Sequence, residues 1–214
     1  MPVALFDLDY TLLDGDCEYE WSAFLFKNNL VDEQFVAGIA RYYADYESGC
    51  LDMLAYESFL LHPLKLLSIE KVLQLREIYL GHIRELIRPV LVDRMNWHRS
   101  QQHELLLITA ANGFLAEPIA EMLGFLNLIC TQVEMKQGAY TGNIIGVPAF
   151  RDGKTQLLDQ WLTRQGFTLA GSWGYSDSHN DLPLLQRVDH PVAVRPDSIL
   201  ERYASQNGWE IIDE

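Results

Sequence analysis

Short hydrophobic runs bounded by polar residues recur along the chain and alternate with longer stretches of helical period. The first run, residues 2–6 (PVALF), is too short for a helix and ends at an aspartate, which indicates a buried parallel strand. Glycines follow or end the helical stretches 114–123 and 155–166, and Gly138 and Gly142 lie in a hairpin pattern at 135–146. Further strands are predicted at 105–109 (LLLIT), 126–132 (LNLICTQ), 172–177 (SWGYSD) and 191–194 (PVAV). This alternation predicts an α/β fold, a doubly wound, Rossmann-like parallel sheet with helices on both faces.

Residues 16–88 have helical period throughout. Asp32 is a candidate N-cap for a helix that Gly49 ends, and Ser68 is a candidate N-cap for a long helix that Pro89 ends. With segments near 17–30 and 52–66, four helices are expected, which is the content of a small bundle. We therefore expect an α/β core formed by residues 1–15 and 89–214, with residues 16–88 as an inserted helical bundle.

Composition narrows the class of protein. Of the 214 residues, 49% are hydrophobic and 21% are charged, as is ordinary for a soluble globular protein. The formal net charge of −14 disfavours nucleic acid and an anionic membrane surface as partners. The three cysteines form no C-x-x-C pair, so neither a zinc site nor a redox motif is indicated. There is no signal-peptide pattern and no run near the roughly 18 apolar residues of a membrane span, so we expect a cytoplasmic protein.

The first cluster of candidate chemistry follows the first predicted strand and reads Asp7-Leu8-Asp9-Tyr10-Thr11. In a strand-exit loop, Asp7 and Asp9 can face one cavity while Leu8 turns away. Two carboxylates so placed can hold a hard cation such as Mg²⁺, or act as nucleophile and general acid–base. Thr11 can brace the loop by hydrogen bonding. Taken alone, the motif is equally compatible with a polar strand end.

Two further clusters indicate an anion site. Thr109-Ala110-Ala111-Asn112-Gly113 lies between a strand and a helix, where a hydroxyl and free backbone N–H groups suit phosphate. The simpler interpretation of this cluster is a Thr or Asn N-cap. The third cluster, residues 151–154 (RDGK), opens a helix. Its Lys154 can neutralise phosphate charge, although an exposed lysine is the more ordinary role.

The fourth cluster, residues 174–183, reads GYSDSHNDLP and follows a later strand. Asp177 is a candidate metal ligand, and Asp181 is a candidate for orienting Lys154 or a metal-bound water. Asn180 is a candidate contact for phosphate or a metal water. The surrounding oxygen ligands suit Mg²⁺ rather than Zn²⁺, so we expect His179 to be a loop residue. Because the carboxyl ends of parallel strands share one edge, all four clusters are expected to meet there.

In this order the clusters resemble the four motifs of the haloacid dehalogenase superfamily: D-x-D-x-T, a hydrophobic strand followed by Thr, Gly-Lys, and S-D-x-x-N-D. The resemblance covers the whole chain. The helical insert lies between the first and second motifs, where subfamily I members carry a helical cap, and the layout is similar to subfamily IB, the phosphoserine phosphatase-like group. The segments DLDYTLLDGD, ITAAN and YSDSHNDLPLL look closest to bacterial histidinol-phosphatase-like proteins.

The resemblance implies a Mg²⁺-dependent phosphomonoesterase that acts on a small phosphorylated metabolite. It implies that Asp7 attacks phosphorus, forms an aspartyl phosphate and binds Mg²⁺. It also implies that Asp9 protonates the leaving alcohol, then activates water, and binds the metal through its backbone carbonyl. The other implied roles are phosphate binding by Thr109, the Ala110 N–H, Lys154 and Asn180, metal binding by Asp177, and support by Thr11 and Asp181.

The sequence departs from phosphoserine phosphatases in two places. The second motif reads Thr-Ala-Ala where those enzymes commonly have Ser-Gly-Gly, and Arg41 is the only arginine in the first two-thirds of the insert. A substrate without a carboxylate is therefore favoured. Histidinol phosphate has an amine and an imidazole, which an acidic and aromatic entry would suit. The entry residues are Asp16, Glu18, Tyr19 and Trp21.

We therefore expect an amino-alcohol phosphate such as histidinol phosphate, selected by Asp16, Glu18 and Trp21. Tyr19 and Trp21 are also compatible with a place in the bundle core, which is the better interpretation for Phe24. The alternatives are a phosphoserine phosphatase, a phosphotransferase or mutase on the same scaffold, and a non-catalytic phosphate-binding module. The oligomeric state stays open.

Overall fold

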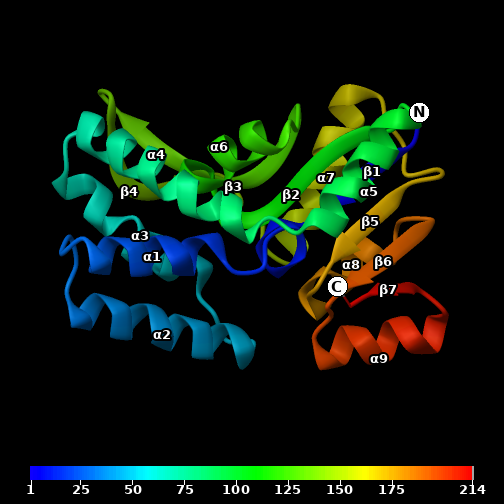
Figure 1. Ribbon diagram of the computed structural model, residues 1–214, viewed down its shortest axis with the longest axis horizontal. Helices are drawn as coiled ribbons and strands as arrows, with labels where there is room; N and C mark the ends of the chain where they lie inside the picture. Colours follow the sequence, from blue (N-terminus) through cyan, green and yellow to red (C-terminus); the bar gives the residue numbers. More distant parts are fainter. Residues whose placement is uncertain (214) are drawn as a thin grey trace.

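The computed structural model describes residues 1–213, and its centre is a seven-stranded sheet with the order β4-β3-β2-β1-β5-β6-β7 (Figure 1). Neighbouring strands are parallel except β3 and β4. The central strand β1 (Val3–Phe6) pairs with β2 (Glu104–Asn112) and β5 (Trp173–Ser176), so strand order reverses at β1. The other strands are β3 (Asn127–Lys136), β4 (Ala139–Ile145), β6 (His190–Val194) and β7 (Glu210–Ile212). The predicted doubly wound sheet is confirmed, and such a reversal is where α/β proteins place their sites.

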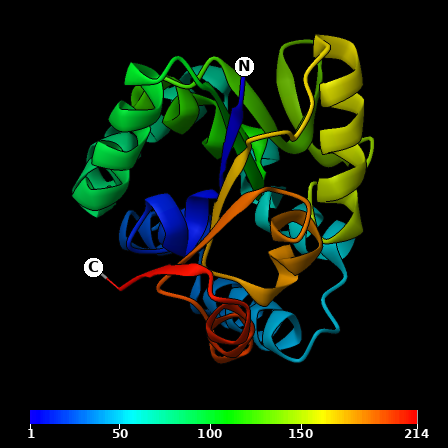
Figure 2. The same cartoon turned by 90° about the vertical axis from the view of Figure 1, so that its right-hand side faces the viewer.

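Side-chain alternation along β1 explains why helices cover both faces of the sheet. Val3 and Leu5 belong to one hydrophobic cluster, and Ala4 and Phe6 belong to the other. The Ala4 and Phe6 face is covered by α5 (Pro89–Ser100) and α6 (Gly113–Leu123). The opposite face is covered by α7 (Asp152–Gln165), α8 (Leu182–Leu185) and α9 (Ser198–Asn207), as Figure 2 shows.

Residues 16–88, between β1 and α5, form four α-helices, which lie to the left in Figure 1. They are α1 (Cys17–Lys27), α2 (Glu33–Glu47), α3 (Met53–Leu60) and α4 (Ile69–Leu86). Side chains of Asp16, Asp32, Asp52 and Ser68 accept hydrogen bonds from the first turns, which confirms the predicted N-caps Asp32 and Ser68. We call this part of the chain the helical segment. Its division from the core at residues 15/16 and 88/89 stays a prediction.

The helical segment packs against the core through aromatic side chains. Trp21 of α1 contacts Tyr79 of α4 and Phe114 of α6 in edge-to-face geometry, with ring centroids 5.1 and 5.3 Å away. All three rings belong to the same hydrophobic cluster as Phe6 of the sheet. The segment is therefore held over one end of the sheet by a continuous hydrophobic core.

Several elements differ from the prediction. Helix α5 was not predicted, because only Leu91, Met95 and His98 are buried along it and the apolar pattern is weak. Pro89 does not end α4, which stops at Leu86. It opens α5 instead, where a missing N–H costs nothing. Helix α9 and strand β7 also lie beyond the last predicted strand, and the short turns Leu8–Leu12, His62–Leu66 and His179–Asp181 complete the elements.

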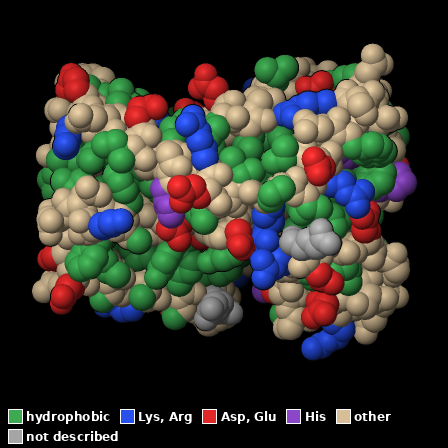
Figure 3. Space-filling view, viewed as in Figure 1, with side chains coloured by type: hydrophobic (Ala, Val, Ile, Leu, Met, Phe, Trp, Pro, Cys, Tyr) green, Lys and Arg blue, Asp and Glu red, His purple; other side chains and the backbone are tan. Residues whose placement is uncertain are grey.

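The surface carries mixed chemistry. On the face shown in Figure 3, acidic, basic and hydrophobic side chains are interspersed over the helical segment and the core. The cysteines Cys17, Cys50 and Cys130 are free thiols. None of the helices within residues 1–213 combines the length and the hydrophobicity that crossing a bilayer requires.

Candidate active site

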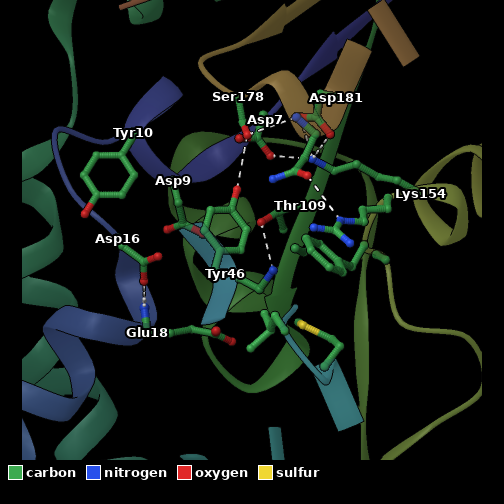
Figure 4. A pocket seen from close by; sticks show the side chains of 18 of the residues that line it. Asp7, Asp9, Tyr10, Asp16, Glu18, Tyr46, Thr109, Lys154, Ser178 and Asp181 are labelled. Carbon is green, nitrogen blue, oxygen red and sulfur yellow. Dashed lines mark hydrogen bonds and ion pairs between the residues drawn. The ribbon is translucent and has the colours of Figure 1, made fainter. Parts of the chain in front are cut away.

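A cavity of about 320 Å³ lies where the carboxyl ends of β1, β2 and β5 meet the helical segment. All four predicted clusters contribute to its core side, through Asp7, Asp9, Thr109, Ala110, Lys154, Asp177, Asn180 and Asp181. The helical segment contributes Asp16, Glu18, Tyr42, Tyr43, Tyr46, Leu51, Met53 and Tyr56. Figure 4 shows Asp7, Lys154 and Asp181 together at one end, with Asp16 and Glu18 at the other. We call these the lysine end and the acidic end of the cavity.

The lysine end is built around a buried ion pair. Lys154 lies in the first turn of α7, and its Nζ is 2.8 Å from Asp7 Oδ1 and 2.9 and 2.8 Å from the two oxygens of Asp181. Ser176 donates a hydrogen bond of 2.7 Å to Asp181 Oδ2. Burial alone would lower the pKa of Lys154, but the charges of Asp181 and Asp7 outweigh it and raise the pKa. Lys154 is therefore a fixed positive charge beside Asp7.

Asp7 keeps its carboxylate form in this environment. It is the first residue after β1, and its backbone N–H donates to the Tyr175 carbonyl at 3.0 Å, which holds it in line with the sheet. Burial raises the pKa of Asp7 to about 6 against the opposing effect of Lys154. At neutral pH the ionised form still prevails, and its Oδ2 does not bond Lys154. This is the state that a nucleophilic carboxylate needs.

Asp177 is joined to Asp7 through Thr11. The Thr11 hydroxyl is 3.0 Å from Asp177 Oδ1 and 3.4 Å from Asp7 Oδ2, while the Asp177 N–H donates to the Thr11 oxygen at 3.0 Å. A hydroxyl has one proton and cannot neutralise two carboxylates. Burial, together with the charges of Asp7 and Asp181, raises the pKa of Asp177 well above its ordinary value. A cation between Asp7 and Asp177 would remove this repulsion.

The donor set at this point suits a hard metal ion. Within residues 1–213, no group of three or more His, Cys, Asp or Glu side chains is arranged to hold a metal. The predicted ligand set does not require three such side chains. It consists of the carboxylates of Asp7 and Asp177 and the backbone carbonyl of Asp9. All three ligands are oxygens, as Mg²⁺ prefers. The residues present therefore fit the predicted ion.

Asp9 faces the cavity because the chain leaves helical geometry inside the loop. Asp9 is extended (φ −71°, ψ 134°) and Tyr10 has a φ of 55°, while Leu8 is fully buried on the other side, as predicted. Asp9 Oδ1 accepts a hydrogen bond of 2.7 Å from the Cys17 N–H. Burial and the charge of Asp16 raise the pKa of Asp9 well above its ordinary value. Asp9 therefore holds a proton more readily than an exposed aspartate does.

The strand that carries Thr109 is longer than predicted. β2 continues to Asn112, and the Ala111 N–H donates to Thr109 Oγ1 at 3.1 Å. Helix α6 begins only at Gly113, and the Asn112 N–H donates to Glu18 Oε1 at 2.8 Å. The Asn112 N–H at the start of α6 is therefore not free for an anion, because Glu18 already accepts its hydrogen bond. Thr109 and Ala110 line the cavity from the end of the strand instead.

The acidic end contains more carboxylates than predicted. Asp16 is the N-cap of α1 and also lines the cavity. Glu18, which is 5% exposed, lines the cavity beside it. Asn112 Nδ2 donates to Glu18 at 2.5 Å and to Glu57 of α3 at 3.2 Å. Burial raises the pKa of both glutamates, that of Glu57 to about 8. The charge of Glu57 raises the pKa of Glu18 further, whereas the hydrogen bond with Glu18 lowers that of Glu57. Tyr56 also lines this end of the cavity.

Trp21 does not belong to the cavity, so its predicted role in substrate selection is wrong. Its side chain is 1% exposed, packs in the core, and does not line the cavity. Residues 18 and 21 point only about 60° apart around α1, but the Trp21 ring turns toward Tyr79 and Phe114 of the core. Tyr19 is 44% exposed and also lies outside the cavity lining. The aromatic wall comes from tyrosines of α2 and α3 instead.

Several site residues had weak signals in the sequence. Glu57 is a lone acid in the otherwise apolar helix α3 (MLAYESFL), which is a hint of a buried polar role. Tyr46 donates to or accepts from Ser178 Oγ at 3.2 Å across the cavity mouth. Arg151 was noted in the third cluster without a role, and it also lines the cavity.

His179, expected to be a loop residue, opens a short 3-10 turn and pairs with Asp197 at 2.8 Å.

Comparisons with known proteins show the family of the chain. A sequence model of the family described as haloacid dehalogenase-like hydrolase matches residues 4–186. The chain is 40% identical over 217 residues to a histidinol-phosphatase of Neisseria meningitidis serogroup C, covering 99% of this chain and 98% of that protein. It is 26% identical to a probable phosphatase of Mycobacterium tuberculosis, covering 98% of this chain and 74% of that one.

Solved structures give the same picture of the fold. A protein with unknown function from Bordetella pertussis Tohama I superimposes with a TM-score of 0.90 at 35% identity, covering 99% of this chain and 98% of that one. A substrate-bound phosphoserine phosphatase superimposes with a TM-score of 0.73 at 18% identity, covering 100% of this chain and 93% of that one. The second likeness concerns the fold alone.

Proposed function

Since this chain belongs to the haloacid dehalogenase-like hydrolase family and is a phosphatase, we propose that it hydrolyses the phosphomonoester of a small amino alcohol, with histidinol phosphate as the best fit. The observation that carries this proposal is the polarity of the cavity. Its lysine end suits a phosphate, and its acidic end, with Asp16 and Glu18, suits a cation. A substrate with a phosphate at one end and positive charge at the other matches both.

In this proposal one carboxylate oxygen of Asp7 attacks the phosphorus atom and forms an aspartyl phosphate, and the other oxygen would remain available to hold Mg²⁺. Asp9 gives its proton to the leaving alcohol and then accepts a proton from the attacking water. Lys154, Thr109 and the Ala110 N–H bind the phosphoryl oxygens, since phosphoryl transfer depends mainly on alignment and on neutralising those oxygens. Asp181 and Thr11 hold Lys154 and Asp177 in place.

Asp7, Asp177 and the Asp9 carbonyl would hold Mg²⁺. When bound, the ion supplies positive charge to the phosphoryl oxygens and offsets the repulsion between the two carboxylates. The protein's part is to present three oxygen ligands from the ends of β1 and β5. This agrees with the way burial and neighbouring charges destabilise the ionised Asp177.

The substrate proposal rests on charge and shape at the acidic end. Histidinol phosphate has an amine two carbons from its phosphate oxygen and an imidazole beyond it. Asp16 and Glu18 would accept hydrogen bonds from these groups, and the rings of Tyr43 and Tyr56 would flank them. Phosphoserine would bring a carboxylate to the same place. Arg151 is the one arginine among the described lining residues, and it is already bonded to Asn180 and Gly49.

A panel of phosphate esters tests this proposal. Histidinol phosphate, phosphoserine, sugar phosphates and an aryl phosphate are compared with Mg²⁺ and after chelation. We expect Mg²⁺-dependent turnover with the highest kcat/KM for histidinol phosphate. A preference for phosphoserine contradicts the substrate, and turnover that survives chelation contradicts the metal. Alcohol acceptors added to the reaction separate hydrolysis from phosphotransfer, because a transferase would form a new ester.

A further inference from the structure

We propose that Arg151 is a positioning residue that orients the side-chain amide of Asn180 for phosphate binding and couples it to the helical segment. This inference rests on the proposed phosphatase site. Arg151 lies three residues before Lys154, and its Nε donates to Asn180 Oδ1 at 3.2 Å. Its Nη1 donates to the Gly49 carbonyl at 3.1 Å, in the loop after α2. One guanidinium group thus joins the fourth motif of the core to the helical segment.

The contact with Arg151 decides which way the Asn180 amide points. A guanidinium N–H can only donate, so it must face the amide oxygen and not the amide nitrogen. Asn180 Nδ2 is therefore turned away from Arg151. It is buried and has no hydrogen-bond partner among residues 1–213, although Asn180 lines the cavity. A buried donor of this kind needs an acceptor, and a phosphoryl oxygen in the cavity would supply one.

The backbone of Arg151 is strained. Its φ is 50° and its ψ is −121°, a region that glycine adopts much more easily than a residue with a side chain. The chain turns sharply here because Gly153 approaches the Pro148 carbonyl so closely that a Cβ would lie 2.0 Å from it. Glycine would be more stable than arginine at this backbone position. We therefore infer that the Arg151 guanidinium has a functional role.

A second contact joins the helical segment to the loop that contains Asn180. The Tyr46 hydroxyl of α2 lies 3.2 Å from Ser178 Oγ, as the dashed line in Figure 4 shows. Ser178 Oγ in turn accepts the Asn180 N–H at 3.2 Å. The guanidinium of Arg151 stacks over Phe150, 4.8 Å from the ring centroid, and Phe150 contacts Tyr46. The loop that holds Asn180 is therefore tied to the helical segment at two points, through Arg151 to Gly49 and through Ser178 to Tyr46.

Arg151→Gly tests this inference, because it removes the guanidinium and relieves the backbone strain together. We expect an unchanged or higher melting temperature, with a loss of about tenfold to a hundredfold in kcat/KM and a similar weakening of orthophosphate binding. Gln102→Gly is the matched control, since Gln102 is exposed with a φ of 59° outside the cavity. It relieves the same kind of strain and leaves both activity and phosphate binding unchanged.

A double variant separates positioning from a general structural role. If Arg151 acts through Asn180, Arg151→Gly combined with Asn180→Ala loses no more than Asn180→Ala alone, and added guanidinium partly restores Arg151→Gly but not the double variant. Multiplied losses, or an Arg151→Gly protein with orthophosphate affinity within twofold of the wild type, overturn the inference. Orthophosphate binding measured by calorimetry needs no turnover, so it tests Arg151 even if the proposed substrate is wrong. Arg151→Lys, which keeps the charge but not the planar fork, should lose most of the effect.

Discussion

The two ends of the cavity both carry buried carboxylates but balance their charges differently. At the lysine end, Lys154 pairs with Asp7 and Asp181 within 2.9 Å. At the acidic end, Glu18 and Glu57 share the amide of Asn112, and neither belongs to an ion pair among the described residues. At the lysine end, the carboxylates are therefore balanced by a lysine of the protein. At the acidic end, a bound cation or a proton would stabilise the carboxylates. In the proposed function, this difference assigns catalysis to the lysine end and substrate selection to the acidic end.

The largest effect is expected from removing the nucleophile. Asp7→Asn keeps the size of the side chain and a neighbour for Lys154, but it cannot form an acyl phosphate. We expect kcat to fall by about 10⁴-fold or more, with a melting temperature close to that of the wild type. Steady-state assays and thermal denaturation measure the two quantities. Asp93→Asn, on an exposed position of α5, is the control. An active Asp7→Asn enzyme would falsify the nucleophile assignment.

Removing Lys154 should leave the lysine end, like the acidic end, with buried carboxylates and no positively charged side chain to balance them. Lys154→Met leaves Asp7, Asp177 and Asp181 without a positive neighbour, so we expect a loss of about 3–5 kcal/mol in stability. Activity should fall by at least about a hundredfold. Chemical denaturation and kcat/KM report these changes. Lys136→Met, at a lysine with a 69% exposed side chain, should alter neither one. A stable and active Lys154→Met protein would mean that the buried pair has no such role.

Removing one charge from the acidic end should affect selection and spare catalysis. For Glu18→Gln we expect KM for histidinol phosphate to rise about 10- to 100-fold, because a hydrogen bond to a charged group is lost. Turnover of an aryl phosphate, which has no amine, should stay within twofold. Glu20→Gln is the matched control, since Glu20 lies on the same helix and pairs with His82 outside the cavity. Equal losses on both substrates would place Glu18 outside substrate selection.

The smallest effect concerns the proton at the acidic end. Burial raises the pKa of Glu57 from 4.5 to about 8, so the folded protein holds this proton more tightly than the unfolded chain. The resulting stabilisation is fully present below pH 4.5 and is lost as pH rises through about 8. Glu57→Gln cannot lose a proton. Its melting temperature relative to the wild type should therefore increase by a few °C between pH 5 and pH 9. A difference that does not change with pH contradicts this account.

Residues that follow a predicted strand could be placed from the sequence. Asp7, Thr109 and Asp177 each follow a hydrophobic run, and parallel strands bring their ends to one edge, so their meeting in one cavity was predictable. Asp181 and Lys154 lie a few residues from such ends. Their 2.8 Å contact was anticipated as a role for Asp181, although its geometry was not.

Other features depended on contacts between distant segments. Trp21 and Glu18 are three residues apart on α1, yet one lies in the core and the other in the cavity. Glu57 reaches Asn112 only because α3 packs near the end of β2. Helix α5 escaped prediction because its buried positions are few and include His98, a polar residue that bonds Tyr175 in the interior.

By itself, the sequence determined the α/β class, the helical insert between the first two strands, and the set of residues at the strand ends. These follow from hydrophobic period and short spacing, which act within a few residues of the chain. Only the tertiary structure decided that Glu18 occupies the start of α6, that Glu57 joins it, and that Arg151 links Asn180 to Gly49. Those contacts depend on how the helical segment packs over the sheet, and no local pattern encodes the direction of a side chain across such an interface.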